Sequence, residues 1–231
     1  MGEAMSVKLR TVTDGIHAGP LFPGWLFNTV VIDGADGDVV VDAGFPWSRR
    51  RLARFLDGRG VAEHVVTHAH GDHVGSTAWL CEHTGAPLAM SAVEADAFEH
   101  GDIASHSGAA ARRLIAPLGH TRRSVDRRLQ EGDSVGGFRV VSQAGHSPGL
   151  LAFWREADRT LIVGDGPINL SKDPNHPRWL RLPDMLDYDP AAAIESRRRL
   201  AELEPELIIS THGHPIRGVD RWLRGVNAVA R

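Results

Sequence analysis

Hydrophobic and polar positions follow two different periods along the chain. Residues 28–44 hold two apolar runs on either side of a Gly/Asp turn, a pattern typical of a β-hairpin. Neither run alternates cleanly between apolar and polar residues, so we expect a sheet that is covered on both faces. Residues 48–60 begin with a serine cap and place Leu52, Phe55 and Leu56 on one side, which predicts an amphipathic helix.

The alternation of strand and helix continues through the rest of the chain. Short apolar runs predict strands within residues 63–70, 87–91, 138–149, 149–165 (a hairpin) and 205–215. Helical patterns cover 76–85, 190–204 and 221–231, residues 95–129 fit helix and loop, and 166–190 fit an irregular surface excursion. Since no linker or repeat interrupts this order, we expect one α/β domain over residues 1–231, built as a four-layer αββα sandwich.

Composition narrows the possible classes of protein. The chain has 231 residues, 42% of them hydrophobic, which suits one domain with an ordinary core. Its net charge of -3 argues against nucleic-acid binding, and no apolar run is long enough for a bilayer. The N-terminus lacks the apolar centre of a signal peptide, and the single Cys81 fits a reducing compartment. We therefore expect a cytoplasmic protein with a small-molecule substrate and neither a nucleic-acid nor a membrane partner; the oligomeric state stays open.

Histidine is the unusual residue of this chain, because its 13 copies are unevenly spread and several of them lie at the ends of predicted strands. Four apolar runs are each followed by glycine and by a residue that can bind metal: "VVTHAHGDH", "VVSQAGHSPG", "LIVGDG" and "LIISTHGHP". Side chains at strand ends are held by a rigid sheet and still project into loops that a substrate can reach. Glycine beside them lets the backbone pass close to a metal or substrate. Four such places in one chain indicate a metal site.

The first of these places can serve two metal positions. In an extended segment, His68 and His70 point the same way and can chelate one ion. Gly71 is expected to break the strand and to turn Asp72 and His73 toward a second point nearby. The sequence therefore predicts two metal positions in one pocket.

Residues from the three later places complete these positions. His146 would complete the first, His212 the second, and Asp165 is an anionic oxygen donor suited to bridging two cations. Two divalent ions are expected, with zinc as the first choice for nitrogen and oxygen ligands and with iron or manganese as alternatives.

The motif His-x-His-x-Asp-His at residues 68–73, followed in order by "GHSPG", "GD" and "THGHP", resembles the metallo-β-lactamase superfamily. The resemblance covers about residues 28–214 and implies a sandwich of the metallo-β-lactamase type. It implies one ion bound by His68, His70 and His146, a second bound by Asp72, His73 and His212, and Asp165 as the bridge. It also implies that Asp42, in "VVVDAG", supports the ligands from behind.

The chain departs from the family pattern at two places. It has "QAGHSPG" where the family often has Pro-Gly-His-Thr-Pro-Gly, and Thr211 replaces the first glycine of Gly-His-Gly. Neither change removes a ligand. His214 could compete with His212, but the register of "THGHP" favours His212.

Two divalent cations in one pocket lower the pKa of a bridging water and supply hydroxide near neutral pH. Asp72 could hold its ion, orient the hydroxide and pass a proton to the leaving group, which makes it the predicted catalytic residue. The sequence thus predicts a dinuclear metal-dependent hydrolase that attacks a thioester, lactone or related ester with a metal-bridging hydroxide. Its substrate-binding residues are unknown at this stage.

Other functions on the same fold compete with this interpretation. An iron-dependent oxygenase or oxidoreductase is one alternative, and a β-lactam hydrolase is another. The family resemblance disfavours the β-lactam hydrolase, because a bridging aspartate such as Asp165 accompanies hydrolases of the glyoxalase II and lactonase kind. The lactonases also carry a tyrosine soon after that aspartate, whereas the only tyrosine here, Tyr188, lies farther along.

The remaining conspicuous residues have plainer interpretations. Surface or capping positions are expected for His17, His64, His83, His100, His106 and His120, and solvated helix faces for residues 49–51 and 197–199. Residues 15–25 could form a loop over the pocket mouth. The segment 176–181, with its histidine, tryptophan and two arginines, could line a substrate pocket or serve as a surface contact.

Overall fold

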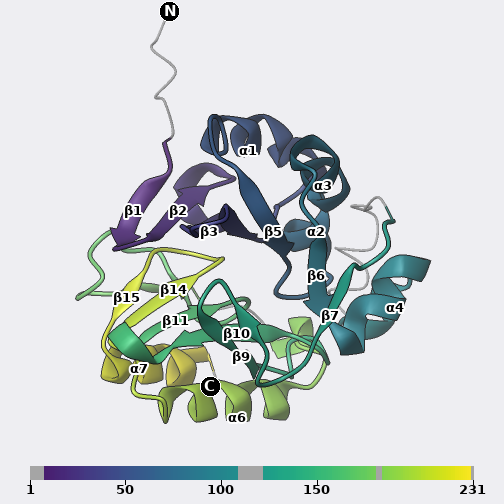
Figure 1. The fold of residues 1–231 in the computed structure, drawn as a ribbon. Coiled ribbons are helices and arrows are strands. Elements are labelled where there is room, and N and C mark those ends of the chain that lie inside the picture. The colour runs from purple at the N-terminus through teal and green to yellow at the C-terminus, as the bar shows by residue number, and fades with distance from the viewer. Residues whose placement is uncertain (1–7, 109–121, 181–183, 230–231) are drawn as a thin grey trace, which may run out of the picture.

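Two β-sheets lie face to face at the centre of the molecule (Figure 1). The computed structural model describes residues 8–108, 122–180 and 184–229. The first sheet contains, in spatial order, β1 (Arg10–Thr13), β2 (Ile16–Pro20), β3 (Asn28–Ile32), β4 (Asp38–Val41), β5 (Val61–Val65), β6 (Leu88–Ser91) and β7 (Arg127–Leu129). Its strands pair antiparallel from β1 to β4 and parallel from β4 to β7.

The second sheet has the spatial order β15, β14, β11, β10, β9, β8. These strands are β8 (Ser134–Val135), β9 (Phe138–Ser142), β10 (Leu151–Arg155), β11 (Thr160–Val163), β14 (Leu207–Ser210) and β15 (Ile216–Arg217). All neighbours pair antiparallel except β11 and β14, which run parallel. A separate small ribbon pairs β12 (Ile168–Asn169) with β13 (Trp179–Leu180).

Helices cover the outer face of each sheet (Figure 1). The first sheet carries α1 (Arg49–Phe55), α2 (Gly71–Val74), α3 (Thr77–Thr84) and α4 (Ala92–His100); the second carries α6 (Pro190–Ala201) and α7 (Val219–Val229). Single 3-10 turns lie at Pro23–Trp25, Pro46–Ser48, Ile103–His106, Glu156–Asp158 and Asp184–Leu186. Among the described residues, no helix has the length and apolar character needed to cross a bilayer.

Successive residues of the central strands face opposite layers, as the period of a strand requires. In β3, Val30 packs between the sheets, and Val31 packs toward α1 and α3. In β10, Phe153 joins the core between the sheets, whereas Trp154 packs against α6 and α7. Both faces of each sheet are therefore buried, which explains why the apolar runs do not alternate. The predicted four-layer αββα sandwich is confirmed.

Several boundaries differ from the prediction. The strand predicted over 63–70 ends at Val65, because Asp42 accepts hydrogen bonds from the backbone N–H and the hydroxyl of Thr67, at 2.8 and 2.9 Å. Gly71 does not break a strand but begins α2. Short strands were also missed: β1, β2, β8 and β15 were not predicted, β7 lies within the expected helix and loop region, and the last predicted strand, over 205–215, ends at Ser210 as β14.

His64 is fully buried, and its prediction as a surface residue was wrong. Its Nδ1 donates to the carbonyl of Val40 at 2.9 Å, and its Nε2 lies 3.0 Å from the hydroxyl of Thr77, so it links β4, β5 and α3. Burial lowers the pKa of His64 to about 4. His83 and His100 are exposed as predicted. The structure leaves His106 half-buried and His17 partly buried beside Asp33, and His120 lies outside the described residues.

This buried imidazole should make stability depend on pH. The folded pKa of His64 is about 4 and the unfolded value is 6.5, so between these values only the unfolded chain binds the proton. Stability should therefore fall as the pH drops from 6.5 to 4, by about 3 kcal/mol in total. Since the lowered pKa values of His68 and His70 add to the slope in the metal-free protein, we expect His64→Gln to reduce it by this share and His83→Gln to keep it whole. Urea unfolding of the three metal-free proteins from pH 4 to 7 measures the effect, and equal slopes in all three would contradict it.

Candidate metal centre

The seven side chains predicted to bind metal meet at one place in the structure. They are His68, His70, Asp72, His73, His146, Asp165 and His212. They come from the loop after β5, from α2, and from the loops that follow β9, β11 and β14. All of these segments leave the carboxyl ends of strands in the two central sheets, so the sandwich itself brings distant parts of the chain together.

Three histidines form the first group. The Nε2 of His68 lies 2.9 Å from the Nδ1 of His70, and the Nε2 of His146 lies 3.0 Å from the same atom. All three side chains are nearly or fully buried. The three ring nitrogens thus point at a common centre, in the combination predicted for the first metal position.

The second group combines two histidines with a carboxylate. The Nε2 atoms of His73 and His212 are 3.1 Å apart. The Oδ2 of Asp72 lies 3.6 Å from the first of these nitrogens and 3.7 Å from the second. His214 takes no part, because its ring packs against the indole of Trp25 with the ring centres 4.9 Å apart.

Asp165 lies between the two groups and contacts both. Its Oδ2 is 3.0 Å from the Nε2 of His146 in the first group. Its Oδ1 is 3.0 Å from the Nε2 of His73 and 2.9 Å from that of His212 in the second. One carboxylate therefore spans both groups, as the bridging assignment requires.

One carboxylate oxygen and one backbone carbonyl oxygen orient the histidines of the second group. The Nδ1 of His73 lies 2.7 Å from the Oδ2 of Asp42, and the Nδ1 of His212 lies 2.6 Å from the carbonyl of Leu26. These oxygens can only accept, so each Nδ1 carries the proton and each Nε2 faces the centre. Asp42 itself adopts a φ of 60°, which few residues other than glycine do, and this supports its predicted place behind the ligands.

The sequence did not reveal the partners of the first group. The Nδ1 of His146 donates to the Oδ1 of Asp187 at 2.8 Å, and the Oγ of Ser107 lies 2.9 Å from the Nε2 of His70. Asp187 also accepts a hydrogen bond from Arg197 at 3.3 Å. Arg197 is consequently buried, so its prediction as part of a solvated face was wrong, whereas Arg198 and Arg199 are exposed as expected.

Glycine next to His212 is required by close packing of the backbone. Gly213 has a φ of 80°, and a Cβ there would lie 2.7 Å from backbone atoms of Asn169. The glycine was expected to leave room for a metal or a substrate. It instead lets the loop that carries His212 approach the neighbouring segment of the chain.

The acidic groups make the centre attractive to positive charge. Burial lowers the pKa of His146, but the charges of Asp165 and Asp187 raise it to about 9. Burial opposes protonation of His73 as well, and Asp72 and Asp42 hold the pKa of that ring well above its usual value. In the metal-free protein, protons on these rings therefore compensate the carboxylates.

The two other histidines of the first group remain neutral. Burial, followed by the positive charge of neighbouring histidines, holds the pKa of His68 well below its usual value and lowers that of His70 to about 3. Burial would raise the pKa of Asp165, but the positive charges of His146 and His212 outweigh it and keep this carboxyl ionised. Neutral imidazole and ionised carboxylate are the forms that bind metal.

The residues present fit a pair of divalent ions. Within the described part of the chain, the Oδ1 of Asp72 is buried and lacks a hydrogen-bond donor, and the Oδ1 of Asp165 faces only ring nitrogens of the predicted ligands. Such oxygens are costly unless a cation compensates them. The ligand atoms form three sets, within each of which all atoms lie within 4.8 Å of one another: His68, His70 and His146; His68, His73 and Asp165; and Asp72, His73 and His212. Nitrogen and oxygen donors of this kind suit zinc, iron or manganese.

A cavity of about 230 Å³ opens onto these residues. Its other wall is apolar and consists of Leu26, Phe27, Ile168, Leu180 and Leu186. The segment 167–189 thus lines the cavity in part. The side chain of His176 is 84% exposed and pairs with Asp173, Trp179 packs on the core beneath α7, and Arg181 lies outside the described residues. Tyr188 is half-exposed and does not line the cavity.

The loop predicted over the pocket mouth is only partly correct. Ile16–Pro20 forms β2, and His17 pairs there with Asp33, away from the cavity. The residues that reach the cavity, Leu26 and Phe27, come just after the predicted range.

The fold and the site together define a class of metal-binding proteins. The fold is an αββα sandwich, and at its strand ends a carboxylate joins two groups of histidines. The sequence model of the Metallo-beta-lactamase superfamily matches residues 25–212, and the chain belongs to that superfamily. The resemblance seen in the sequence is therefore confirmed.

Similar proteins agree with this assignment. "Probable metallo-hydrolase YflN" of Bacillus subtilis is 28% identical over 205 residues, which cover 78% of this chain and 76% of that protein. A beta-lactamase domain protein from Burkholderia ambifaria has 29% identity and a TM-score of 0.64, over 95% of this chain and 75% of the other. The di-iron-bound form of TTHA1623 has 28% identity and a TM-score of 0.64, over 86% and 93% of the two chains.

Proposed function

We propose that this protein is a dinuclear metal-dependent hydrolase that cleaves a thioester, lactone or related ester of a small molecule in the cytoplasm. The observation that carries the proposal is the position of Asp165, whose two oxygens contact both histidine groups. The name of the similar Bacillus subtilis protein, a metallo-hydrolase, supports the same class of reaction.

The chain's own residues divide the work of such a reaction. His68, His70 and His146 would hold one ion, Asp72, His73 and His212 the other, with Asp165 between them. When bound, two divalent cations lower the pKa of water and stabilise negative charge on a carbonyl oxygen. Asp72 lies at the edge of the second group and lines the cavity. Its carboxylate is placed to accept a proton from the attacking water and to return it to the leaving oxygen or sulfur.

The cavity supports a small, largely apolar substrate. Its volume of about 230 Å³ is below the ~300–1,000 Å³ typical of ligand pockets. Five apolar side chains line it, and among the described lining residues there is no lysine or arginine. A phosphodiester or the carboxylate of a β-lactam would have no cationic side chain to pair with there, whereas an aliphatic acyl group would bury its surface.

A turnover screen tests the proposed function. Thioesters, lactones, phosphodiesters and β-lactams are offered to protein purified without added metal, with and without a chelator. We expect about two metal ions per chain, and hydrolysis of aliphatic thioesters or lactones that stops with the chelator and returns with zinc or manganese. Turnover of β-lactams alone, or protein that binds no metal, would overturn the proposal.

The di-iron-bound form of TTHA1623 favours one competing function, an iron-dependent oxygenase or oxidoreductase. Metal analysis separates the two. Zinc with hydrolysis supports the hydrolase; iron, together with oxygen consumption and no hydrolysis, would support the oxidoreductase.

A further inference from the structure

Glu94 is a buried carboxylate that no part of the proposed reaction uses. It lies in the first turn of α4, and its exposed fraction is 0%. Its Oε2 accepts the backbone N–H of Ala69 at 2.6 Å. Its Oε1 accepts the backbone N–H of Gly149 at 2.9 Å and the hydroxyl of Ser147. In the described chain, no lysine or arginine forms an ion pair with it, so these donors stabilise its charge.

The donors of Glu94 belong to the two loops that carry the first group of histidines. Ala69 lies between His68 and His70, and Ser147 directly follows His146. The two oxygens of one carboxylate thus bind the two loops separately. Since the chain leaves β5 for the first loop and β9 for the second, Glu94 fixes the distance between ligands from different sheets.

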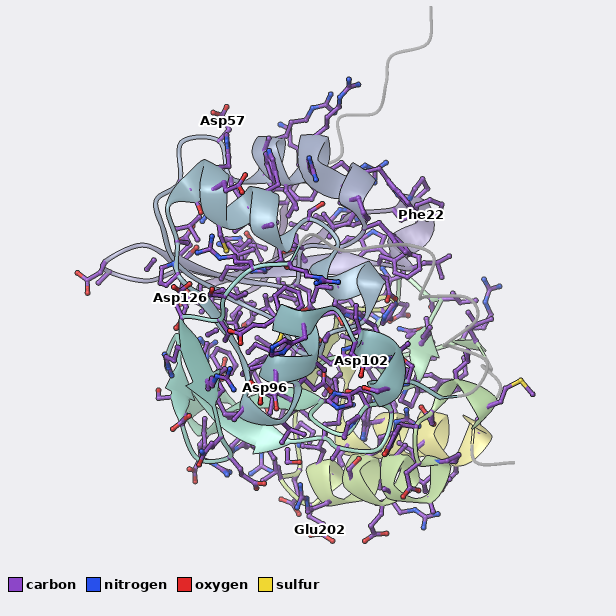
Figure 2. The ribbon with its side chains drawn as sticks, turned by 90° about the vertical axis from the view of Figure 1, so that its right-hand side faces the viewer. Phe22, Asp57, Asp96, Asp102, Asp126 and Glu202 are labelled. Carbon is purple, nitrogen blue, oxygen red and sulfur yellow. The ribbon has the colours of Figure 1, made fainter. Side chains whose placement is uncertain are left out.

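Glu94 is not a simple helix cap, although Ser91-x-x-Glu94 has the spacing of a capping box. Ser91 does cap the helix, through the backbone N–H of Val93 at 3.2 Å. In a capping box, the glutamate would return to the backbone of Ser91, but here both oxygens face the ligand loops. Asp96, farther along the same helix, points to solvent instead (Figure 2).

The second group of histidines also has carboxylates close to it, as the first group has Glu94. His73 faces Asp42 directly, with Asp72 nearby. His68 and His70 have no carboxylate hydrogen-bonded to their rings among the described residues, and Glu94 places one behind the backbone that joins them. A buried carboxylate there favours a cation at the first position, since the low dielectric of the interior screens little.

We propose that Glu94 is a positioning residue that sets the geometry, and with it the affinity, of the first metal position without touching the metal. This inference rests on the proposed dinuclear centre. It assigns to α4 a part in metal binding, because the helix presents the carboxylate that holds His68, His70 and His146 in register. The second position, which Glu94 does not contact, is independent of it.

Metal binding by variants tests the role. Metal-free wild type, Glu94→Gln, Ser147→Ala and Glu99→Gln are titrated with Co²⁺ and followed by absorption, and with Zn²⁺ by calorimetry. Glu99 is a matched control, because it lies on α4 and also accepts a backbone N–H, that of Val125 at 2.7 Å. We expect wild type and Glu99→Gln to bind two ions alike. Glu94→Gln should bind one of the two about 10–100 times more weakly and leave the other nearly unchanged.

The outcomes separate a positioning role from plain stabilisation. The proposal would be overturned if Glu94→Gln bound both ions more weakly to the same extent, or if it bound both as tightly as wild type. If Glu94→Gln does not fold, Ser147→Ala decides, since it removes only one donor; a selective loss supports the role and unchanged binding overturns it. Wild type that binds no metal would refute the dinuclear centre itself, whereas two ions bound equally by wild type and Glu94→Gln would refute only the role of Glu94.

Discussion

Replacement of Asp72 by alanine should lower kcat/KM for hydrolysis by about three orders of magnitude, as the loss of a group that moves a proton in the reaction does. The Oδ2 of Asp72 lies 3.6 and 3.7 Å from the two imidazole nitrogens of the second group, so the same variant should also bind the second ion more weakly. Kinetics with the substrate found by the screen, together with metal analysis, measure both effects.

Asp72→Asn separates the two roles of this side chain. The amide keeps an oxygen near the second group but cannot accept a proton, so we expect this variant to retain more metal than activity. Asp57→Asn, at an exposed position on the molecular surface, serves as the control and should behave as wild type (Figure 2). Full activity of Asp72→Ala at saturating metal would exclude a role for this residue in proton transfer.

The sequence predicted the set of side chains that meet at the centre because each follows an apolar strand. A buried strand has one direction and one end, so a polar residue after it is placed by the sheet. No such pattern marks His64, which was expected at the surface. It lies within β5 rather than after it, and its burial depends on Val40 and Thr77, which approach from β4 and α3. Only the packing of those elements distinguishes it from an exposed histidine.

The supporting residues could not be predicted, since they come from segments with no pattern of their own. Asp187 holds His146, yet Asp184 and Asp189 lie close to it in the sequence and nothing local selects among them. Glu94 fits a helix cap from its spacing alone, and its contacts with the ligand loops follow from the way α4 lies against the sheet. Short edge strands such as β1 and β15 were missed because so few residues carry too little periodicity.

Replacement of Asp165 by asparagine should be the most damaging single change to the centre. In the described chain, Asp165 is the only carboxylate that contacts histidines of both groups. An amide offers one oxygen and one NH2 group that cannot bind a metal, and it removes the negative charge that two cations would share. We expect the metal content to fall from about two ions to at most one per chain. Hydrolysis should fall by at least about a thousandfold, since a metal contributes several kcal/mol to stabilising the transition state.

A partner variant distinguishes loss of the bridge from general damage to the centre. Asp187→Asn removes a carboxylate that contacts only His146 of the predicted ligands, through Nδ1 at 2.8 Å, and leaves Asp165 in place. This variant should bind one of the two ions about 10–100 times more weakly. At saturating metal it should still bind two ions and regain most of its activity. If Asp165→Asn also regains two ions and full activity at saturating metal, the carboxylate is not a bridge. Excess metal can compensate the loss of a residue that only orients its neighbours, but it cannot replace a ligand that both ions share.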